Sequence, residues 1–94
     1  MPEPTNTVRG PGQEVIEPIK TISSQDGRSR VHFWRRDDGL FQFLEQHLHD
    51  DEEQGQSYSM WRVGYPASGL FPDLLAAESE ARRSLAWLKR ENSN

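Results

Sequence analysis

The chain has 94 residues, no cysteine and a formal net charge of −4 at pH 7. Its length is typical of one small domain, and the missing cysteines exclude disulfides, thiol catalysis and cysteine-ligated metal centres. The negative charge argues weakly against nucleic acid as the main partner, and no apolar run approaches the roughly 20 residues of a membrane-spanning helix. The first residues lack the basic and apolar regions of a secretory signal, so we expect a cytoplasmic protein with no membrane partner.

Apolar residues are unevenly distributed along the chain. They make up 33% of it, but residues 1–29 hold only six of them and none of the nine aromatic residues. A segment with so little apolar surface cannot offset the entropy cost of ordering. We therefore predict a flexible arm over residues 1–26, a single small domain over residues 27–91 and a frayed C-terminus over residues 92–94.

One part of the predicted arm has the composition of a strand. Residues 15–22 are rich in β-branched side chains, and Asp26 followed by Gly27 is typical of a hairpin turn. Pro18 would confine such a strand to the edge of a sheet, because proline has no N–H to donate. The alternatives are an extra edge strand near residues 19–24 and a mobile tail.

Three strands are predicted next. Residues 30–36 are rich in β-branched and aromatic side chains, and residues 37–39 form a turn in which the glycine provides a positive φ. A second strand follows over about residues 40–48. Residues 49–55 are polar and unpatterned, which predicts a loop, and residues 56–64 predict a third strand.

The register of the first hairpin decides which side chains share a face. A three-residue turn places Phe33 opposite Phe43, whereas a two-residue turn pairs Trp34 with Phe43 and exchanges the faces. We favour the first register because it gathers the phenylalanines on one face. The second face still carries large apolar groups, so either the arm or residues 66–72 cover it, or it is a contact surface.

The last segment predicts one α-helix. Asp73 is a good N-cap, since its carboxylate can accept hydrogen bonds from the free N–H groups of the first turn. Trp61 and Trp87 are expected to close the core. The order of elements predicts an α+β fold, a three-stranded antiparallel β-meander with one C-terminal α-helix packed on one face. Apolar residues recur every three or four positions along that helix, at Leu74, Ala77, Ala81, Leu85 and Leu88.

Basic and aromatic side chains alternate along the first strand, and this pattern gives the candidate binding residues. Arg30, His32, Trp34 and Arg36 should project from one face, an arrangement that suits a phosphate backbone and a stacked base. Residues 30–94 nevertheless carry 8 basic and 11 acidic side chains, which opposes a nucleic-acid partner. An ion-paired sheet face is the ordinary alternative for these four residues.

No motif for catalysis or cofactor binding is present. The chain has neither a Gly-x-Ser-x-Gly sequence nor a glycine-rich phosphate loop. His47 and His49, followed by the acidic residues 50–53, are of the types found in metal sites. A calcium loop beginning at Asp50 would, however, need glutamate where Trp61 stands. We therefore predict a protein that is not an enzyme and that holds no metal and no cofactor.

The C-terminal sequence resembles a group of short bacterial proteins of unknown function. In that group an aromatic-rich sheet is followed by a Gly-Leu-Phe turn, an Ala-Glu-x-Glu-Ala-Arg helix and a closing Trp-Leu pair. The matching segments here are residues 68–73, 77–82 and 87–88. The resemblance covers residues 30–88 and implies a bacterial origin, but it implies no activity.

In outline, three strands followed by a helix also resemble the AP2-type and integrase N-terminal DNA-binding modules. Those modules read DNA with basic and aromatic residues of the sheet, a role that the resemblance implies for Arg30, Trp34, Arg35 and Arg36. The third predicted strand contains only Arg62 as a basic residue and lies beside the acidic segment. In this respect the chain departs from the pattern of those modules.

From these observations we predict a non-enzymatic protein-interaction or accessory module. Its partner is expected to be a second copy, giving a homodimer through the sheet face, or another protein. The alternative is a nucleic-acid-binding module that uses the strand over residues 30–36.

Overall fold

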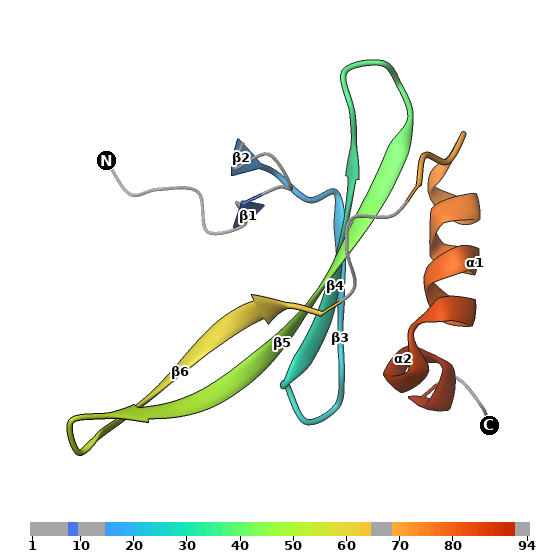
Figure 1. Ribbon diagram of the computed structural model, residues 1–94. Helices are drawn as coiled ribbons and strands as arrows, with labels where there is room; N and C mark the ends of the chain where they lie inside the picture. Colours follow the sequence, from blue (N-terminus) through green and yellow to red (C-terminus); the bar gives the residue numbers. More distant parts are fainter. Residues whose placement is uncertain (1–7, 10–14, 65–68, 92–94) are drawn as a thin grey trace.

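The computed structural model describes residues 8–9, 15–64 and 69–91. Four strands form an antiparallel sheet in sequence order, and two short helices follow them (Figure 1). A separate two-stranded pair precedes the sheet, made of β1 (Val8–Arg9) and β2 (Val15–Ile16). The sheet consists of β3 (Lys20–Ser23), β4 (Ser29–Arg35), β5 (Phe41–Glu53) and β6 (Gln56–Val63), and the helices are α1 (Leu74–Ser84) and α2 (Ala86–Glu91).

The α+β class and the antiparallel sheet are confirmed, but the predicted strand count is wrong. Strand β3 adds a fourth strand at the edge of the sheet, where it pairs Ile22 with Val31 of β4. An extra edge strand near residues 19–24 was one of the two alternatives that the composition of residues 15–22 allowed. Strand β3 lies before the domain boundary predicted at residue 26. Much of the predicted arm lies outside the described residues, and so does the predicted frayed C-terminus.

The single predicted helix is two helices in the structure. The first begins as predicted, because the Asp73 carboxylate accepts a hydrogen bond of 2.8 Å from the Ala76 N–H. At Leu85 the chain leaves helical geometry, with φ −93° and ψ 113°. In an unbroken helix Leu85 and Trp87 would point about 160° apart, toward nearly opposite sides. The break lets both side chains enter the core, where they are 2% and 7% exposed.

The hairpin between β4 and β5 has the predicted three-residue turn and register. Phe33 pairs with Phe43, and Gly39 has the positive φ of 85° that the turn requires. The phenylalanines therefore share one face of the sheet. The two helices cover this face (Figure 1). The core between the layers contains Val31, Phe33, Phe43, Ala77, Ala81, Leu85, Trp87 and Leu88.

The predicted loop over residues 49–55 is wrong. Strand β5 continues to Glu53 and turns into β6 through Gln54 and Gly55, whose φ values are 53° and 80°. Two successive positive φ values match the twist of a tight hairpin. The sequence shows no strand pattern here because residues 49–60 are exposed on both faces, so neither face needs apolar side chains.

These twelve residues, 49–60, form a projection that we call the outer ribbon. Strand β4 pairs with β5 only as far as His47, and beyond Leu48 the strand β5 has β6 as its only partner among the described strands. In Figure 1 the ribbon extends away from the helices. The sheet is therefore divided into a helix-covered body and an uncovered two-stranded extension.

The sheet face opposite the helices has its own small apolar cluster. Ile16 of β2 packs with Trp34 and Leu44, and all three are buried. Trp61 lies on this same face and is half-buried, so its predicted place beside Trp87 in the core is wrong. Part of the face is thus covered from the N-terminal side by β2, as one of the two sequence alternatives expected.

Candidate functional site: the outer edge of the sheet

The residues predicted from the basic strand lie where the alternation places them, but they do not form an exposed surface. Arg30, His32 and Trp34 project from the face opposite the helices, and Arg36 follows the last residue of β4. His32 and Trp34 are only 5% and 6% exposed. A stacked base would have to displace β2 to reach the indole of Trp34, since Ile16 packs against it.

His32 is held inside the sheet by two hydrogen bonds. Its Nδ1 lies 2.8 Å from the Thr21 hydroxyl and its Nε2 lies 3.0 Å from the Gln46 amide oxygen. Because an amide oxygen only accepts, Nε2 carries the proton and the hydroxyl donates to Nδ1. Burial lowers the pKa of His32, and the nearby charge of Arg30 acts in the same direction, whereas the hydrogen bond that His32 donates to Gln46 acts to raise it. A neutral histidine in these contacts stabilises the sheet.

Two cationic groups of this strand, those of Arg30 and Arg36, already have partners within the chain, whereas Arg35 is exposed. The guanidinium of Arg30 stacks 3.7 Å from the centroid of the Trp61 ring, and its Nε donates to the Gln46 amide oxygen at 2.8 Å. Arg36 pairs with Asp38 at 3.1 Å. Binding by these residues stays a prediction, and the contacts observed are those of an internally paired sheet face.

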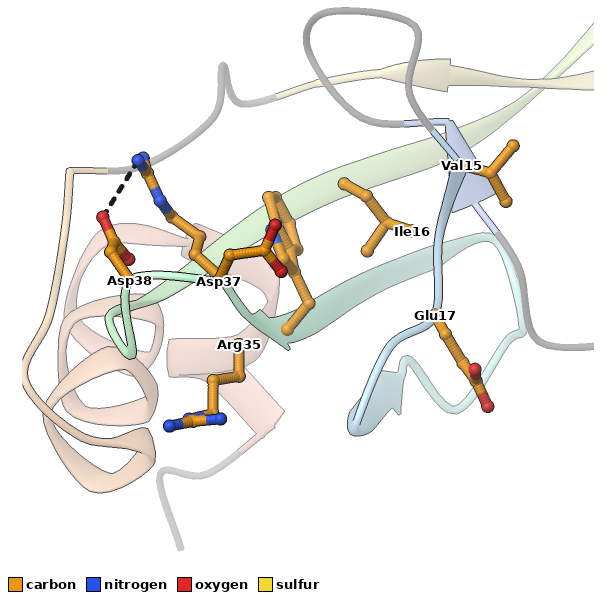
Figure 2. Close-up of a pocket in the computed structure, with 8 residues that line it drawn as sticks. Val15, Ile16, Glu17, Arg35, Asp37 and Asp38 are labelled. Atoms are coloured by element: carbon orange, nitrogen blue, oxygen red, sulfur yellow. Dashed lines mark ion pairs between the residues drawn. The ribbon is translucent and has the colours of Figure 1, made fainter.

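A cavity of about 620 Å³ lies between β2 and the turn that follows β4 (Figure 2). In Figure 2 the side chain of Ile16 points into the space, whereas Val15 and Glu17 point away from it. Its charged lining residues are of both signs, and Arg36 and Asp38 pair with each other. The lining therefore favours neither an anion nor a cation. It consists of Val15, Ile16, Glu17, Trp34, Arg35, Arg36, Asp37 and Asp38.

A second polar cluster brings together a serine, a histidine and a carboxylate. The Ser29 hydroxyl lies 2.8 Å from Nδ1 of His47, and Nε2 of His47 lies 3.0 Å from the Glu45 carboxylate. These are the residue types of a hydrolytic triad. The same carboxylate, on a residue 7% exposed, accepts a hydrogen bond of 2.7 Å from the Trp87 indole.

The backbone of Gly64 lies close against this cluster on one side. A Cβ at position 64 would lie 2.2 Å from the His47 ring and 2.7 Å from the Glu45 carboxylate, so the chain passes directly over both groups. The cluster therefore joins α2 to the sheet, and the His47 side chain stays 36% exposed. Sequence reasoning missed it, although the favoured register puts Ser29, Glu45 and His47 on the face of Phe43.

The outer edge of β6 differs from both of these sites because its backbone is open. Among the described strands, β6 has β5 on one side and no strand on the other. The Gly64 N–H donates to the Glu45 carbonyl, so even-numbered residues of β6 bond to β5 and odd-numbered residues point their N–H and C=O groups outward. The outward-pointing residues are Ser57, Ser59, Trp61 and Val63.

Side chains beside this edge are unusually apolar for an exposed surface. Tyr58 and Met60 are 40% and 43% exposed on the helix side of the sheet, and Val63 is 57% exposed on the other side. The edge contains neither proline nor lysine, the residues with which proteins usually protect an open strand. At the opposite edge β3 is only four residues long, contains Lys20 and follows Pro18 closely.

The described residues contain neither a cluster placed to hold a metal ion nor a helix that could cross a membrane. No group of three or more histidine, aspartate or glutamate side chains within the described ranges is placed to hold a metal ion. Among the same residues, neither helix is long and apolar enough to cross a membrane.

Comparisons with known proteins add no second source of information. No family model matches the chain, and no match is found among curated proteins or solved structures. The resemblances to short bacterial proteins and to DNA-binding modules stay predictions. Geometry alone therefore supports the candidate site. Among the described strands, β6 has an outer edge with which no other strand pairs.

Proposed function

We propose that the chain is a non-enzymatic protein-interaction module whose contact surface is the outer ribbon together with the edge of β6. One observation carries this proposal: along its eight residues β6 presents a row of outward N–H and C=O groups with no other described strand beside it. Such an edge is a template for pairing with another polypeptide strand. An edge of this length favours a polypeptide partner over a small molecule.

The exposure of the ribbon supports the same function. Two-stranded hairpins without a covering layer are marginally stable in water. Residues 49–60 have no such layer among the described residues, and their side-chain contacts run mainly between the two strands themselves. A partner strand or surface would supply the burial that the ribbon lacks.

The nucleic-acid alternative has no observation in its favour. Two of the three arginines of the basic strand are engaged, Arg30 by Trp61 and Gln46 and Arg36 by Asp38. The ribbon itself carries the acidic residues 50–53, which would repel a phosphate backbone. Nucleic-acid binding therefore stays the weaker prediction.

Photo-crosslinking inside the producing cell tests the proposed function. A photoreactive amino acid at position 58 should give covalent adducts with a polypeptide, because Tyr58 lies in the proposed contact surface. The same amino acid at position 75 is the matched control, since Leu75 is an apolar residue 75% exposed on α1, away from the ribbon. Equal adducts from both positions, or none from position 58, would contradict the proposal.

A further inference from the structure

We propose that the polypeptide that binds this edge is a second copy of the same chain, joined through antiparallel pairing of β6 with β6 about a two-fold axis. This inference rests on the proposed function and adds the identity of the partner and the register of pairing. The two four-stranded sheets would then form one continuous eight-stranded sheet. The evidence comes from the backbone, the side chains and the charges of β6.

The backbone of β6 selects a single register for full overlap. In an antiparallel pair, residues that point their N–H and C=O groups at the partner oppose one another and exchange two hydrogen bonds. The four outward residues of β6 all find partners only when Ser57 faces Val63 of the partner subunit and Ser59 faces Trp61 of the partner subunit. The two-fold axis then passes beside Met60. A shift of two residues in either direction leaves outward groups unpaired.

The side chains fit this register because small residues face large ones. On the face opposite the helices, each serine lies directly across from a large apolar residue of the other copy. On the helix side Met60 lies beside its own copy and Tyr58 faces Arg62 of the partner subunit. An aromatic ring opposite a guanidinium is a favourable cross-strand pair. The strand is therefore complementary to itself.

The charges of the hairpin are compatible with self-pairing. Arg62 is the only charged residue of β6, and in this register it faces a tyrosine. The acidic residues 50–53 lie on β5, one strand back from the edge. With neighbouring strands about 4.8 Å apart, the two acidic strands would be about 14 Å from each other, beyond the screening length at physiological salt. Repulsion between them would be weak.

Continuity of the edge also favours pairing with a strand. The register of β5 with β6 runs without interruption from the pair Gln46 and Val63 to the pair Glu53 and Gln56. A bulge would twist part of an edge away from a partner, and none interrupts this ladder. The whole length of β6 is thus presented as one regular strand.

Single cysteines test the register directly, because the chain contains no cysteine of its own. In the proposed pair, position 60 faces itself at a Cα separation of about 4.5 Å, within the range of a disulfide. Met60→Cys should therefore form a disulfide-linked dimer under mild oxidation. Tyr58→Cys is the matched control, since its two copies would lie about 13 Å apart. A mixture of Tyr58→Cys and Arg62→Cys should form the mixed dimer.

Sedimentation of the full chain tests association without oxidation. The wild-type mass should rise from monomer to dimer with concentration. Met60→Lys places two positive charges opposite each other and should weaken association by roughly tenfold or more. Leu75→Lys makes the same change at an exposed position outside the edge and should leave association unchanged. Both positions are exposed, so circular dichroism should show that each variant is folded.

The outcomes separate this inference from the proposed function. A monomeric mass at every concentration overturns the dimer, and so does a dimer that Met60→Lys leaves intact. A dimer in which Tyr58→Cys links as readily as Met60→Cys overturns the register. Adducts from position 58 to a different polypeptide only, with a monomeric mass, would overturn the second copy but keep the interaction function. If position 58 gives no adducts and the mass stays monomeric, both are overturned.

Discussion

The body of the molecule and the outer ribbon share strands β5 and β6 but are held together by different contacts. In the body, Phe43 of β5 is fully buried beneath the helices and stacks on Phe71, with the two ring centroids 5.9 Å apart. In the ribbon, Asp50 accepts a 2.6 Å hydrogen bond from the Ser59 hydroxyl, and both side chains are exposed. Burial stabilises the first region, whereas backbone pairing and exposed polar contacts order the second.

This difference teaches where each region is sensitive. Burial of apolar area is the main favourable contribution to folding, whereas exposed hydrogen bonds and ion pairs contribute little. Truncation of a side chain in the body should therefore destabilise the fold strongly. The same kind of truncation in the ribbon should leave the fold intact. Changes in the ribbon should instead alter association with a partner.

Truncation of an aromatic ring should show the contrast at its largest. Phe33→Ala removes a fully buried ring that contacts Phe43 and should cost about 3–5 kcal/mol of the free energy of unfolding. Tyr58→Ala in the ribbon should cost less than about 0.5 kcal/mol. Denaturant titration followed by circular dichroism measures both. If Phe33→Ala does not fold, Phe33→Leu should still cost more than Tyr58→Ala, and equal losses would remove the distinction between the regions.

Removal of a carboxylate should show a smaller contrast. Glu45→Ala leaves the buried Trp87 indole without its acceptor and should cost about 1–3 kcal/mol. Glu53→Ala, at the exposed end of the ribbon, should change stability little. Trp87→Phe made together with Glu45→Ala should cost less than the sum of the single changes, because both remove the same hydrogen bond. Strict additivity would show that the indole and the carboxylate do not interact.

The N-cap of α1 should affect the stability of the body without altering association at the edge. Asp73→Ala removes the acceptor for the Ala76 N–H and should cost about 1 kcal/mol, whereas Asp73→Asn should retain most of the stability. The dimer dissociation constant measured by sedimentation should be the same for all three proteins. A change in association with Asp73→Ala would mean that the helix and the ribbon are coupled.

Acidification should produce the smallest effect and should again separate the two regions. Because burial lowers the pKa of His32, only the unfolded chain gains a proton at this residue as the pH falls through about 6.5. Stability should therefore decrease below that pH, until the folded histidine also titrates. His32→Gln should flatten this part of the stability curve.

A separate decrease is expected at lower pH, and it has a different origin. Hydrogen bonds from Ser24, Ser59 and Ser84 lower the pKa values of Asp26, Asp50 and Glu80, respectively. Stability from these groups is present above their ordinary pKa values near 4 and is lost as the pH falls below them. Comparing the two pH windows would distinguish the buried histidine from the exposed carboxylates.

Local signals explain which parts of the fold were predictable. The turn at residues 37–39 and the run of phenylalanines determine the register of Phe33 with Phe43, and Asp73 marks the start of α1 by its side-chain chemistry. The break at Leu85 was not predictable in the same way. The apolar spacing continues through it, and only contact with the sheet favours burial of both Leu85 and Trp87.

The candidate site was less predictable because it depends on sheet order. The alternation of residues 30–36 correctly gives the common face of Arg30, His32 and Trp34, but burial beneath β2 comes from a segment distant in sequence. Similarly, nothing local to β6 says that its outer side has no neighbouring strand among the described residues. An exposed ribbon also lacks the apolar alternation by which strands are usually found, so residues 49–53 resembled a loop.

The hydrogen bond between Trp87 and Glu45 also has a consequence for which sheet can form. If β5 slipped by one residue against β4, every side chain of β5 would move to the opposite face. Glu45 would then leave the indole, and Gln46 or Leu44 would stand beneath α2 in its place. The buried carboxylate thus discriminates between alternative alignments of the same strands.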